Sequence, residues 1–330
     1  MTRILTRADL ESLLDPPAVI AALRAAFAAL GAGRAQVPQR MGLELPTGST
    51  FFYMPGFLDA APAPVLGTKV VAIQPDNPAR GLPRIQAVCL LHDPVTGDLR
   101  AVLDATFLTE IRTACTSALV TDYLALPGAD TLLVFGTGPQ ARAHLAAIAA
   151  VRPLRAAWVA GRTPEQAAAF VAAHAARFPF PLTPIAGPDA IRAALAGAAI
   201  VATCTNGAAP LFEGAWLQPG THVNAVGSYR PATREVDTAT IVRARVLVDT
   251  RQGALAEAGD LLIPLAEGAI IPDHIRGELA DLVGDRVALR ESPADITLFK
   301  SVGFALEDAA TAALACARAE ARGVGVEVAF

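Results

Sequence analysis

A short apolar run that leads into a glycine-rich turn and then a helical pattern constrains this chain more than any other feature. The run Thr131-Leu-Leu-Val-Phe135 is followed by Gly136-x-Gly138-x-x-Ala141. The first glycine permits a tight turn, the second lets a pyrophosphate approach the backbone, and the small third residue lets the helix lie close to the strand. A purely structural turn is the alternative, but the flanking strand and helix favour a dinucleotide site.

The length and charge narrow the class of protein. A chain of 330 residues suits two domains, each able to bury a core. The net charge is −4 and the Lys and Arg residues are scattered, which argues against a nucleic-acid partner. Charge or proline interrupts every apolar run before the roughly 20 residues that a membrane span needs. The N-terminal residues lack the apolar core of a secretory signal, so we expect a cytoplasmic protein with a small-molecule partner.

The cysteines and histidines predict neither a disulfide framework nor a metal site. No two cysteines form a C-x-x-C pair, so all four are expected to be buried thiols. The histidines have no ligand-type spacing, so we predict no metal. These residues are Cys89, Cys115, Cys204, Cys316, His92, His144, His174, His222 and His274.

The first third of the chain predicts a helical cap followed by an antiparallel sheet. Residues 7–30 carry two helical stretches, and residues 37–105 carry short β-like runs separated by turn signals. A helix is expected over about 106–125, and Leu126-Pro-Gly128 is the best candidate for a domain boundary.

Beyond that boundary the pattern is typical of a doubly wound parallel sheet, because strands and helices alternate. A final Ala-rich helix over about 304–321 is expected to pack back on the first domain. The predicted fold is α/β, with a Rossmann domain over 126–303 inserted in a discontinuous α+β domain over 1–125 and 304–330. The expected strands lie near 131–135, 156–160, 182–186, 199–203, 221–226, 245–249 and 296–302.

The end of the second Rossmann strand favours NADP over NAD. An NAD-selecting carboxylate is expected about 20 residues beyond the glycines, but the chain has Gly161-Arg162-Thr163 there. An arginine and a hydroxyl would hold a 2′-phosphate through charge-assisted hydrogen bonds. The alternative is a surface arginine followed by a threonine that caps the helix beginning at Pro164.

Two cations upstream are candidates for a ligand site. Lys69 lies inside the apolar run Pro64-Val-Leu-Gly-Thr-Lys69-Val-Val, where an unpaired ammonium would be costly. It is expected to bind a carboxylate or, with a lowered pKa, to donate a proton, although a structural lysine at a strand end is the alternative. Arg112 lies on a predicted helix among small residues, and a salt bridge with a neighbouring acid is the alternative to a ligand contact.

Five separate motifs are spread over most of the chain. They are Gly67-Thr-Lys69, Glu110-Ile-Arg112-Thr113-Ala-Cys-Thr-Ser117, Gly136-Thr-Gly-Pro-Gln140-Ala, Val223-Asn-Ala-Val-Gly-Ser228, and Phe299-Lys-Ser-Val-Gly303 with Glu307-Asp308. In these motifs and in their order, the chain resembles the ornithine cyclodeaminase and mu-crystallin family. This resemblance implies a homodimer whose subunits each combine a Rossmann domain with a discontinuous substrate-binding and dimerisation domain.

The resemblance also implies a set of site residues. Arg40, Lys69 and Arg112 would surround the substrate carboxylate, and Glu257 matches a substrate-side position. The implied cofactor contacts, beyond Gly161 to Thr163, are Arg112, Thr113, Gly136, Thr137, Gly138, Pro139, Gln140, Thr203, Thr205, Val226, Gly227, Ser228, Ser301, Val302 and Gly303.

One departure from the family's pattern directs the functional hypothesis. The cyclodeaminases and related alanine dehydrogenases carry a catalytic aspartate after the Val-Gly motif, whereas this chain has Ser228. Its Gly-Arg-Thr and Val-Gly-Ser features are similar to those of mu-crystallin and the bacterial cyclic ketimine reductases. We therefore expect reduction of Δ1-pyrroline-2-carboxylate or Δ1-piperideine-2-carboxylate to L-proline or L-pipecolate, with NADPH preferred to NADH.

In this hypothesis Lys69 holds or supplies the imine proton, Arg112 anchors the carboxylate, and Ser228 orients the network. The preferred ring size stays open. The alternatives are an ornithine cyclodeaminase or amino-acid dehydrogenase that acts on an open-chain substrate, and a mu-crystallin-like NADP-dependent ligand-binding protein.

Overall fold

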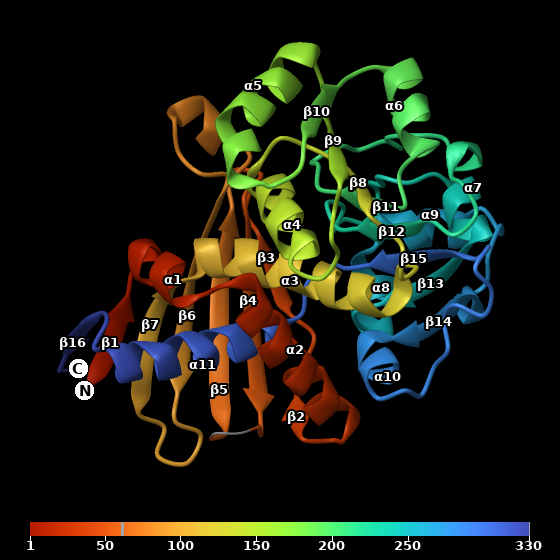
Figure 1. Ribbon diagram of the computed structural model, residues 1–330. Helices are drawn as coiled ribbons and strands as arrows, with labels where there is room; N and C mark the ends of the chain where they lie inside the picture. The colour runs from red at the N-terminus through yellow and green to blue at the C-terminus, as the bar shows by residue number, and fades with distance from the viewer. Residues whose placement is uncertain (61–62, 330) are drawn as a thin grey trace. The chain divides into compact units, whose positions relative to one another are not determined.

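The chain folds into two compact units, which a computed structural model describes over residues 1–60 and 63–329. The first unit comprises residues 1–113 and 303–330, and the second comprises residues 114–302. The division lies within helix α3 (Ala105–Leu124) rather than after its end. Figure 1 shows the chain leaving the first unit along α3 and returning to it at α11 (Ala305–Arg322).

A mixed sheet forms the centre of the first unit. Its strand order is β16-β1-β7-β6-β5-β4-β2, and β3 pairs with β4. The strands from β4 to β7 are antiparallel neighbours, as the turn-separated apolar runs predict, whereas β1 is parallel to β7. The bounds are β1 Thr2–Leu5, β2 Ala35–Gln36, β3 Met41–Glu44, β4 Thr50–Leu58, β5 Val65–Ile73, β6 Ile85–His92, β7 Leu99–Asp104 and β16 Val326–Val328.

Helices α1 (Arg7–Leu13), α2 (Pro16–Gly31) and α11 pack on one face of this sheet. Figure 1 shows α11 lying across the strands in front of β5. The approach is close, because a Cβ added at Gly67 would lie 3.0 Å from the Ala309 Cβ. Side chains alternate between the two faces of a strand, so Gly67 and Lys69 of β5 both lie on the side that α11 covers.

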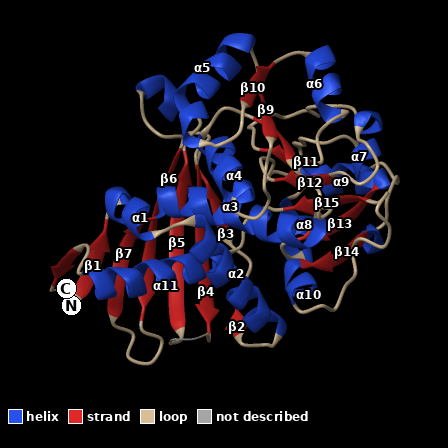
Figure 2. Cartoon of the chain, viewed as in Figure 1, coloured by secondary structure: helices blue, strands red, loops and turns tan. Residues whose placement is uncertain are grey.

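The second unit contains a fully parallel sheet, and its helices are packed around that sheet (Figure 2). The strand order is β10-β9-β8-β11-β12-β15-β13-β14, so the order reverses between β8 and β11. The strands are β8 Thr131–Phe135, β9 Ala156–Ala160, β10 Leu182–Ile185, β11 Ile200–Thr203, β12 His222–Ala225, β13 Ala244–Val248, β14 Ile275–Glu278 and β15 Ile296–Lys300.

The helices of this unit bury small apolar faces against the sheet. Its core contains residues from the central strands, such as Leu133, Val201 and Val223, which are fully buried. The helices are α4 Pro139–Ala149, α5 Pro164–His174, α6 Pro188–Leu195, α7 Thr238–Arg243, α8 Arg251–Glu257, α9 Gly259–Ala266 and α10 Leu279–Val283. Short 3₁₀ turns lie at η1 Asn77–Arg80, η2 Ala175–Arg177, η3 Gly214–Trp216 and η4 Pro272–His274.

The predicted α/β class with a doubly wound parallel sheet is confirmed. The strands expected after Leu126-Pro-Gly128 all form within two residues of the predicted ends. Five of the described strands, each at most four residues long, were not predicted from the sequence: β1, β2, β3, β14 and β16.

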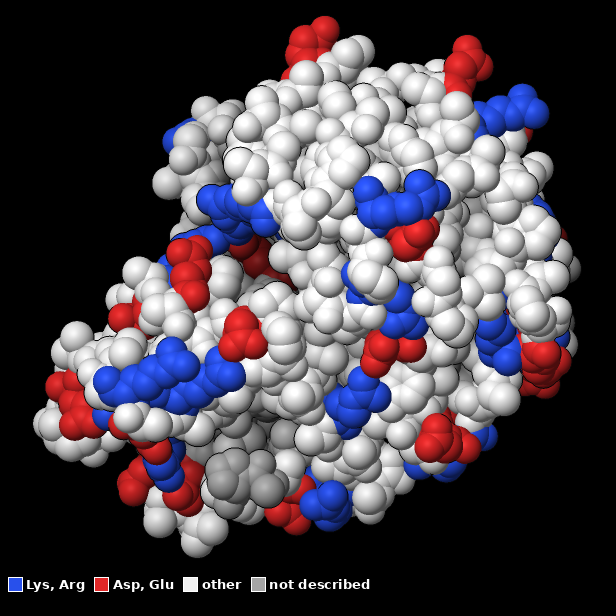
Figure 3. Space-filling view, viewed as in Figure 1, with Lys and Arg blue, Asp and Glu red and all other residues white. Residues whose placement is uncertain are grey.

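Within the described residues, no single helix is long and apolar enough to cross a membrane, and only α1 and α2 taken together, bent by 86°, meet that length and composition. On the face drawn in Figure 3, Lys and Arg side chains lie in small groups among Asp and Glu rather than in a continuous band. No group of three His, Cys, Asp or Glu side chains in the described part of the chain is arranged to hold a metal ion.

Candidate functional site

The glycine-rich turn lies where the strand order of the parallel sheet reverses. Strands β8 and β11 are neighbours, and the chain runs outward from them in opposite directions along the sheet. In open α/β sheets, ligands bind in the crevice beyond the carboxyl ends of the strands at such a switch point. Gly136 follows β8 and Cys204 follows β11, so both loops lie at this switch point.

The backbone of the turn fits a phosphate group. Gly136 has φ +112°, and a Cβ there would lie 2.6 Å from the Cys204 carbonyl oxygen, so glycine is required. A Cβ at Gly138 would meet nothing among the described atoms within 4 Å, so this stretch of backbone is accessible to a ligand. Gly138 is the N-cap of α4, with Pro139 in the first turn, so no side chain at the cap position competes for the first N–H groups. The residues present therefore fit a dinucleotide.

Gly161, Arg162 and Thr163 follow β9, the strand on the other side of β8. Gly161 allows α5 to approach, because a Cβ there would lie 2.8 Å from the Ala167 nitrogen. The Thr163 hydroxyl accepts a hydrogen bond of 3.3 Å from the Gln166 nitrogen and so caps α5. The capping alternative thus holds for Thr163, while Arg162 is exposed.

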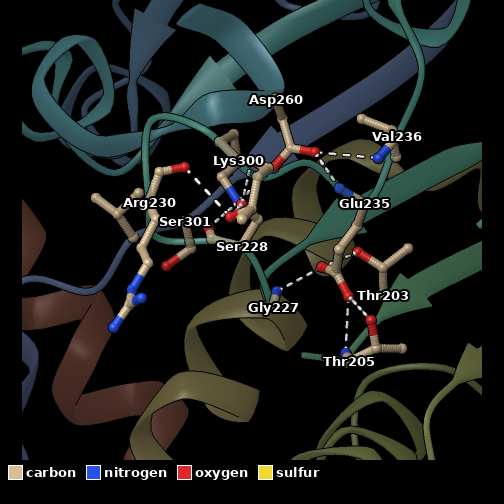
Figure 4. Close-up of polar contacts among 12 residues, drawn as sticks. Thr203, Thr205, Gly227, Ser228, Arg230, Glu235, Val236, Asp260, Lys300 and Ser301 are labelled. Carbon is tan, nitrogen blue, oxygen red and sulfur yellow. Dashed lines mark hydrogen bonds and ion pairs between the residues drawn. The ribbon is translucent and has the colours of Figure 1, made fainter. Parts of the chain in front are cut away.

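The loops after β11 and β12 are joined through one buried acid that the sequence analysis did not single out. Thr203, Thr205 and Gly227 all donate hydrogen bonds to the carboxylate of Glu235, as Figure 4 shows. Three predicted cofactor residues from two strand ends are therefore brought together. Glu235 could have been identified only by knowing that Thr203, Thr205 and Gly227 all donate to one acceptor. The sequence does not show which donors share an acceptor.

The Ser228 side chain is buried and already engaged within its own loop. Its hydroxyl donates to the Thr233 carbonyl oxygen at 2.6 Å and lies 2.9 Å from the Thr233 hydroxyl. The backbone nitrogen of Val302 and the hydroxyl of Ser301 both donate to Asp249, at 2.8 Å and 3.3 Å. These two loops follow β12 and β15, which are neighbouring strands.

The predicted cations of the first unit gather around two acids of α11. Lys69 Nζ lies 2.7 Å from Asp308, Arg112 Nε lies 3.0 Å from the same carboxylate, and Arg112 Nη1 lies 2.6 Å from Glu307. All four side chains are at most 5% exposed. The salt-bridge alternative for Arg112 is therefore realised. In the sequence, Glu307 and Asp308 are distinguished by their position at the start of an otherwise Ala-rich helix.

Lys69 has a lowered pKa, of about 8. Burial is the largest cause, the positive charge of Arg112 comes next, and Asp308 opposes both. Arg40 lowers the pKa further through its charge, and its guanidinium lies over the ring of Phe52 at 4.3 Å. Three cations thus share one neighbourhood with two carboxylates, which leaves a positive excess suited to an anionic ligand.

The remaining predicted residues are divided between the two units. Thr113 follows Arg112 on α3 and donates its hydroxyl to the Thr109 carbonyl oxygen at 2.7 Å. Gly303 lies beside Arg112, since a Cβ there would be 3.1 Å from both terminal guanidinium nitrogens. Glu257 ends α8 in the second unit. Thr137 and Gln140 belong to the turn before α4 and to its first residues.

Comparison with known proteins decides the family. The Ornithine cyclodeaminase/mu-crystallin family matches residues 1–323. The chain belongs to this family. The membership confirms the resemblance inferred from five separate motifs.

Individual known proteins are similar to the chain over nearly its whole length. A Δ1-pyrroline-2-carboxylate reductase of Bacillus cereus is 35% identical over 329 residues, which cover 99% of each chain. A solved Thermococcus litoralis Δ1-pyrroline-2-carboxylate reductase in complex with NADH and L-proline has 36% identity and a TM-score of 0.94, covering 99% of this chain and 100% of that one. An archaeal alanine dehydrogenase dimer with bound NAD has 28% identity and a TM-score of 0.92, covering 100% and 99%.

Proposed function

We propose that this protein reduces a cyclic ketimine, Δ1-pyrroline-2-carboxylate or Δ1-piperideine-2-carboxylate, to L-proline or L-pipecolate with NADPH. The observation that carries the proposal is the buried Lys69, with a pKa near 8, held beside Arg112 in a chain that has Ser228 where a catalytic aspartate is expected. The similarity to the B. cereus and T. litoralis reductases supports the same reaction.

The substrate is a small anion, and the first unit offers the charges to bind it. Arg40, Lys69 and Arg112 attract the carboxylate next to the imine carbon, and Glu307 and Asp308 hold two of these cations in place. Fixing the ring in one orientation places its imine carbon for reaction, which is the main contribution that a protein makes to hydride transfer. Glu257 is proposed to lie on the substrate side as well.

Reduction of a C=N bond adds a hydride to carbon and a proton to nitrogen. The nicotinamide cofactor, when bound, supplies the hydride. Lys69 supplies the proton from Nζ, since a pKa of about 8 keeps most of the ammonium protonated at neutral pH and yet makes proton transfer favourable. Asp308 then stabilises the return of a proton to the amine.

The residues proposed to hold the cofactor come from the strand ends of the second unit. The N–H groups at the start of α4, with Gly136 to Gln140, bind the pyrophosphate, and the loops at Thr203 to Thr205, Val226 to Ser228 and Ser301 to Gly303 surround the rest. Ser228 serves through its backbone position, because its hydroxyl is bonded to Thr233. Arg112 and Thr113 are proposed as further contacts.

The preference for NADPH is proposed from Arg162. It is an exposed guanidinium at the carboxyl end of β9, where an NAD-selecting carboxylate would otherwise lie. A guanidinium at this place binds a 2′-phosphate through bidentate, charge-assisted hydrogen bonds. NADH is expected to be accepted more weakly.

A homodimer is proposed from the face of the first unit's sheet opposite α11. Tyr53, Val70 and Val88 lie side by side there, and Pro55, Thr68, Leu90 and Val102 form the next row. All these side chains are partly exposed. An apolar sheet face of this kind is suited to a second copy of the chain, and the similar archaeal alanine dehydrogenase is a dimer.

The test is NADPH oxidation at 340 nm with Δ1-pyrroline-2-carboxylate, run beside NADH and a Lys69→Ala variant, with ammonia measured in parallel. We expect rapid oxidation without ammonia release, and loss of at least about a hundred-fold in the variant. Ammonia release from ornithine without net NADPH oxidation would identify a cyclodeaminase instead. Cofactor and ligand binding without either product would identify a ligand-binding protein.

A further inference from the structure

Glu235 lies in the segment between β12 and α7 and accepts four hydrogen bonds while fully buried. One carboxylate oxygen receives the backbone nitrogen and the hydroxyl of Thr205, both at 2.7 Å. The other oxygen receives the Thr203 hydroxyl at 2.7 Å and the Gly227 nitrogen at 2.6 Å. The loops that end β11 and β12 are thus tied to a single side chain (Figure 4).

The two loops approach each other closely beside this carboxylate. A Cβ at Gly227 would lie 2.2 Å from the Thr205 carbonyl oxygen, so the two loops are in contact. Four donors directed at two oxygens require a full carboxylate, since an amide would present two N–H groups to two of them. The geometry therefore specifies an acid at this position.

A buried ion pair, Asp260 with Lys300, is bonded to the backbone of Glu235. Asp260 accepts from the backbone nitrogens of Glu235 and Val236 at 2.7 Å and 3.0 Å. Its other oxygen lies 2.9 Å from Lys300 Nζ, which also donates to the Ser228 carbonyl oxygen at 2.6 Å. Lys300, Asp260 and Glu235 are all fully buried. The ion pair thus connects the end of β15 to the segment after β12, which carries both Ser228 and Glu235.

We propose that Glu235 is a positioning residue that fixes the loops after β11 and β12 and thereby sets the place of the nicotinamide ring, with Asp260 and Lys300 as its support. The proposal rests on the proposed cofactor site. None of the three residues is among the proposed ligand contacts, and each acts through the backbone or side chains of residues that are. Loosening of these loops would displace the ring relative to the imine carbon, and small displacements reduce rates by about a hundred-fold.

The experiment compares Glu235→Gln with wild type and with Glu267→Gln. The control removes the same charge from an exposed carboxylate of the same unit, which bonds Arg234 and Thr238. Hydrogen exchange of peptides covering 203–207 and 226–230 is measured without cofactor. We then measure the fluorescence of bound NADPH and the Kd for NADPH. We also measure kcat and KM for Δ1-pyrroline-2-carboxylate and the deuterium isotope effect with 4-deuterated NADPH.

We expect Glu235→Gln to exchange faster in both peptides, to alter the fluorescence of bound NADPH, and to lower kcat by about ten- to hundred-fold with a larger isotope effect. The Kd for NADPH should change much less than kcat, because the phosphate-binding turn is untouched. Unchanged fluorescence and isotope effect, or an activity loss equal to the loss of folded protein, would overturn the proposal.

A second variant covers the case in which Glu235→Gln does not fold. Asp260→Asn keeps the oxygen that accepts from both backbone nitrogens and removes only the charge that faces Lys300. We expect smaller changes in the same direction, and wild-type fluorescence and exchange would refute the proposal. If wild type does not reduce the ketimine, the proposed function fails on its own, while exchange and NADPH fluorescence still decide the role of Glu235.

Discussion

Lys69 Nζ lies 2.7 Å from Oδ2 of Asp308, and neither side chain is more than 2% exposed. The ammonium is therefore both desolvated, which lowers its pKa, and paired, which limits that fall to a value of about 8. With this pKa, the ammonium proposed as the proton donor is mostly charged at neutral pH and can lose its proton slightly above it.

The first prediction concerns the pH dependence of kcat. Lys69 donates only while protonated, so kcat for ketimine reduction should fall as the pH rises through about 8. Lys69→Arg keeps the charge but does not lose a proton in this range. We expect a much lower rate in this variant with no fall near pH 8. An unchanged alkaline fall in the variant would assign it to another group.

The second prediction is that Asp308→Asn moves this alkaline fall to lower pH. Asp308 is the group that raises the Lys69 pKa, so its removal leaves burial, Arg112 and Arg40, all of which lower that pKa, without opposition from this carboxylate. Loss of one partner from a buried ion pair also costs about 3–5 kcal/mol. A kcat profile and a melting curve check both effects, and a profile that stays in place would contradict the pairing.

The third prediction concerns cofactor choice. Arg162→Ala should raise KM for NADPH by about ten- to hundred-fold, the value of one or two charge-assisted hydrogen bonds, and should leave KM for NADH within about two-fold. Arg155→Ala is the matched control, since Arg155 pairs with Asp130 on the surface of the same unit. Equal effects on both cofactors would remove Arg162 as the selecting residue.

The fourth prediction concerns acid stability. His144 is fully buried, its Nδ1 lies 2.8 Å from the Gln140 carbonyl oxygen, and burial lowers its pKa from 6.5 to about 4. Between these two pH values the unfolded chain binds a proton that the folded chain does not, so stability falls as the pH falls through this window. The loss is about 3 kcal/mol. His144→Gln should melt with a weaker pH dependence there, and an identical slope would be inconsistent with a buried neutral histidine.

The fifth prediction concerns the proposed dimer. Leu90 lies on the apolar sheet face opposite α11, so Leu90→Arg should convert a dimer to a monomer in analytical ultracentrifugation. Val95→Arg, at a turn where Val95 is 88% exposed, is the control and should not change the mass. A wild-type monomer would contradict the proposal directly.

The sequence predicted the parts of this molecule that local patterns encode. Thr131 to Phe135 is a strand because it is short, apolar and followed by a required glycine, and the later strands that were predicted are likewise short apolar runs. β14 escaped detection because Ile275 to Glu278 carries only one large apolar side chain.

Single residues of the candidate site could be predicted from the sequence, but the side chains with which they pair could not. Lys69 was identifiable as a charge in an apolar strand, but its partner lies near the other end of the chain, on a helix whose register no local pattern fixes. Glu235 was not identifiable, since its donors come from Thr203, Thr205 and Gly227 and meet only when β11 and β12 pair. Ser228 was identified, but its bond to Thr233 was not.

Helix α11 supplies both counter-ions of the cation group, although it belongs to the last stretch of the sequence. During synthesis the ribosome therefore makes Lys69 and Arg112, and then the whole parallel sheet, before Glu307 and Asp308 exist. A nascent or truncated chain that stops before α11 would lack the two acids that pair with Lys69 and Arg112 in the folded protein. The buried group of Lys69, Arg112, Glu307 and Asp308 can therefore be completed only after the whole parallel sheet has been made, although the strand that carries its lysine precedes that sheet in the sequence.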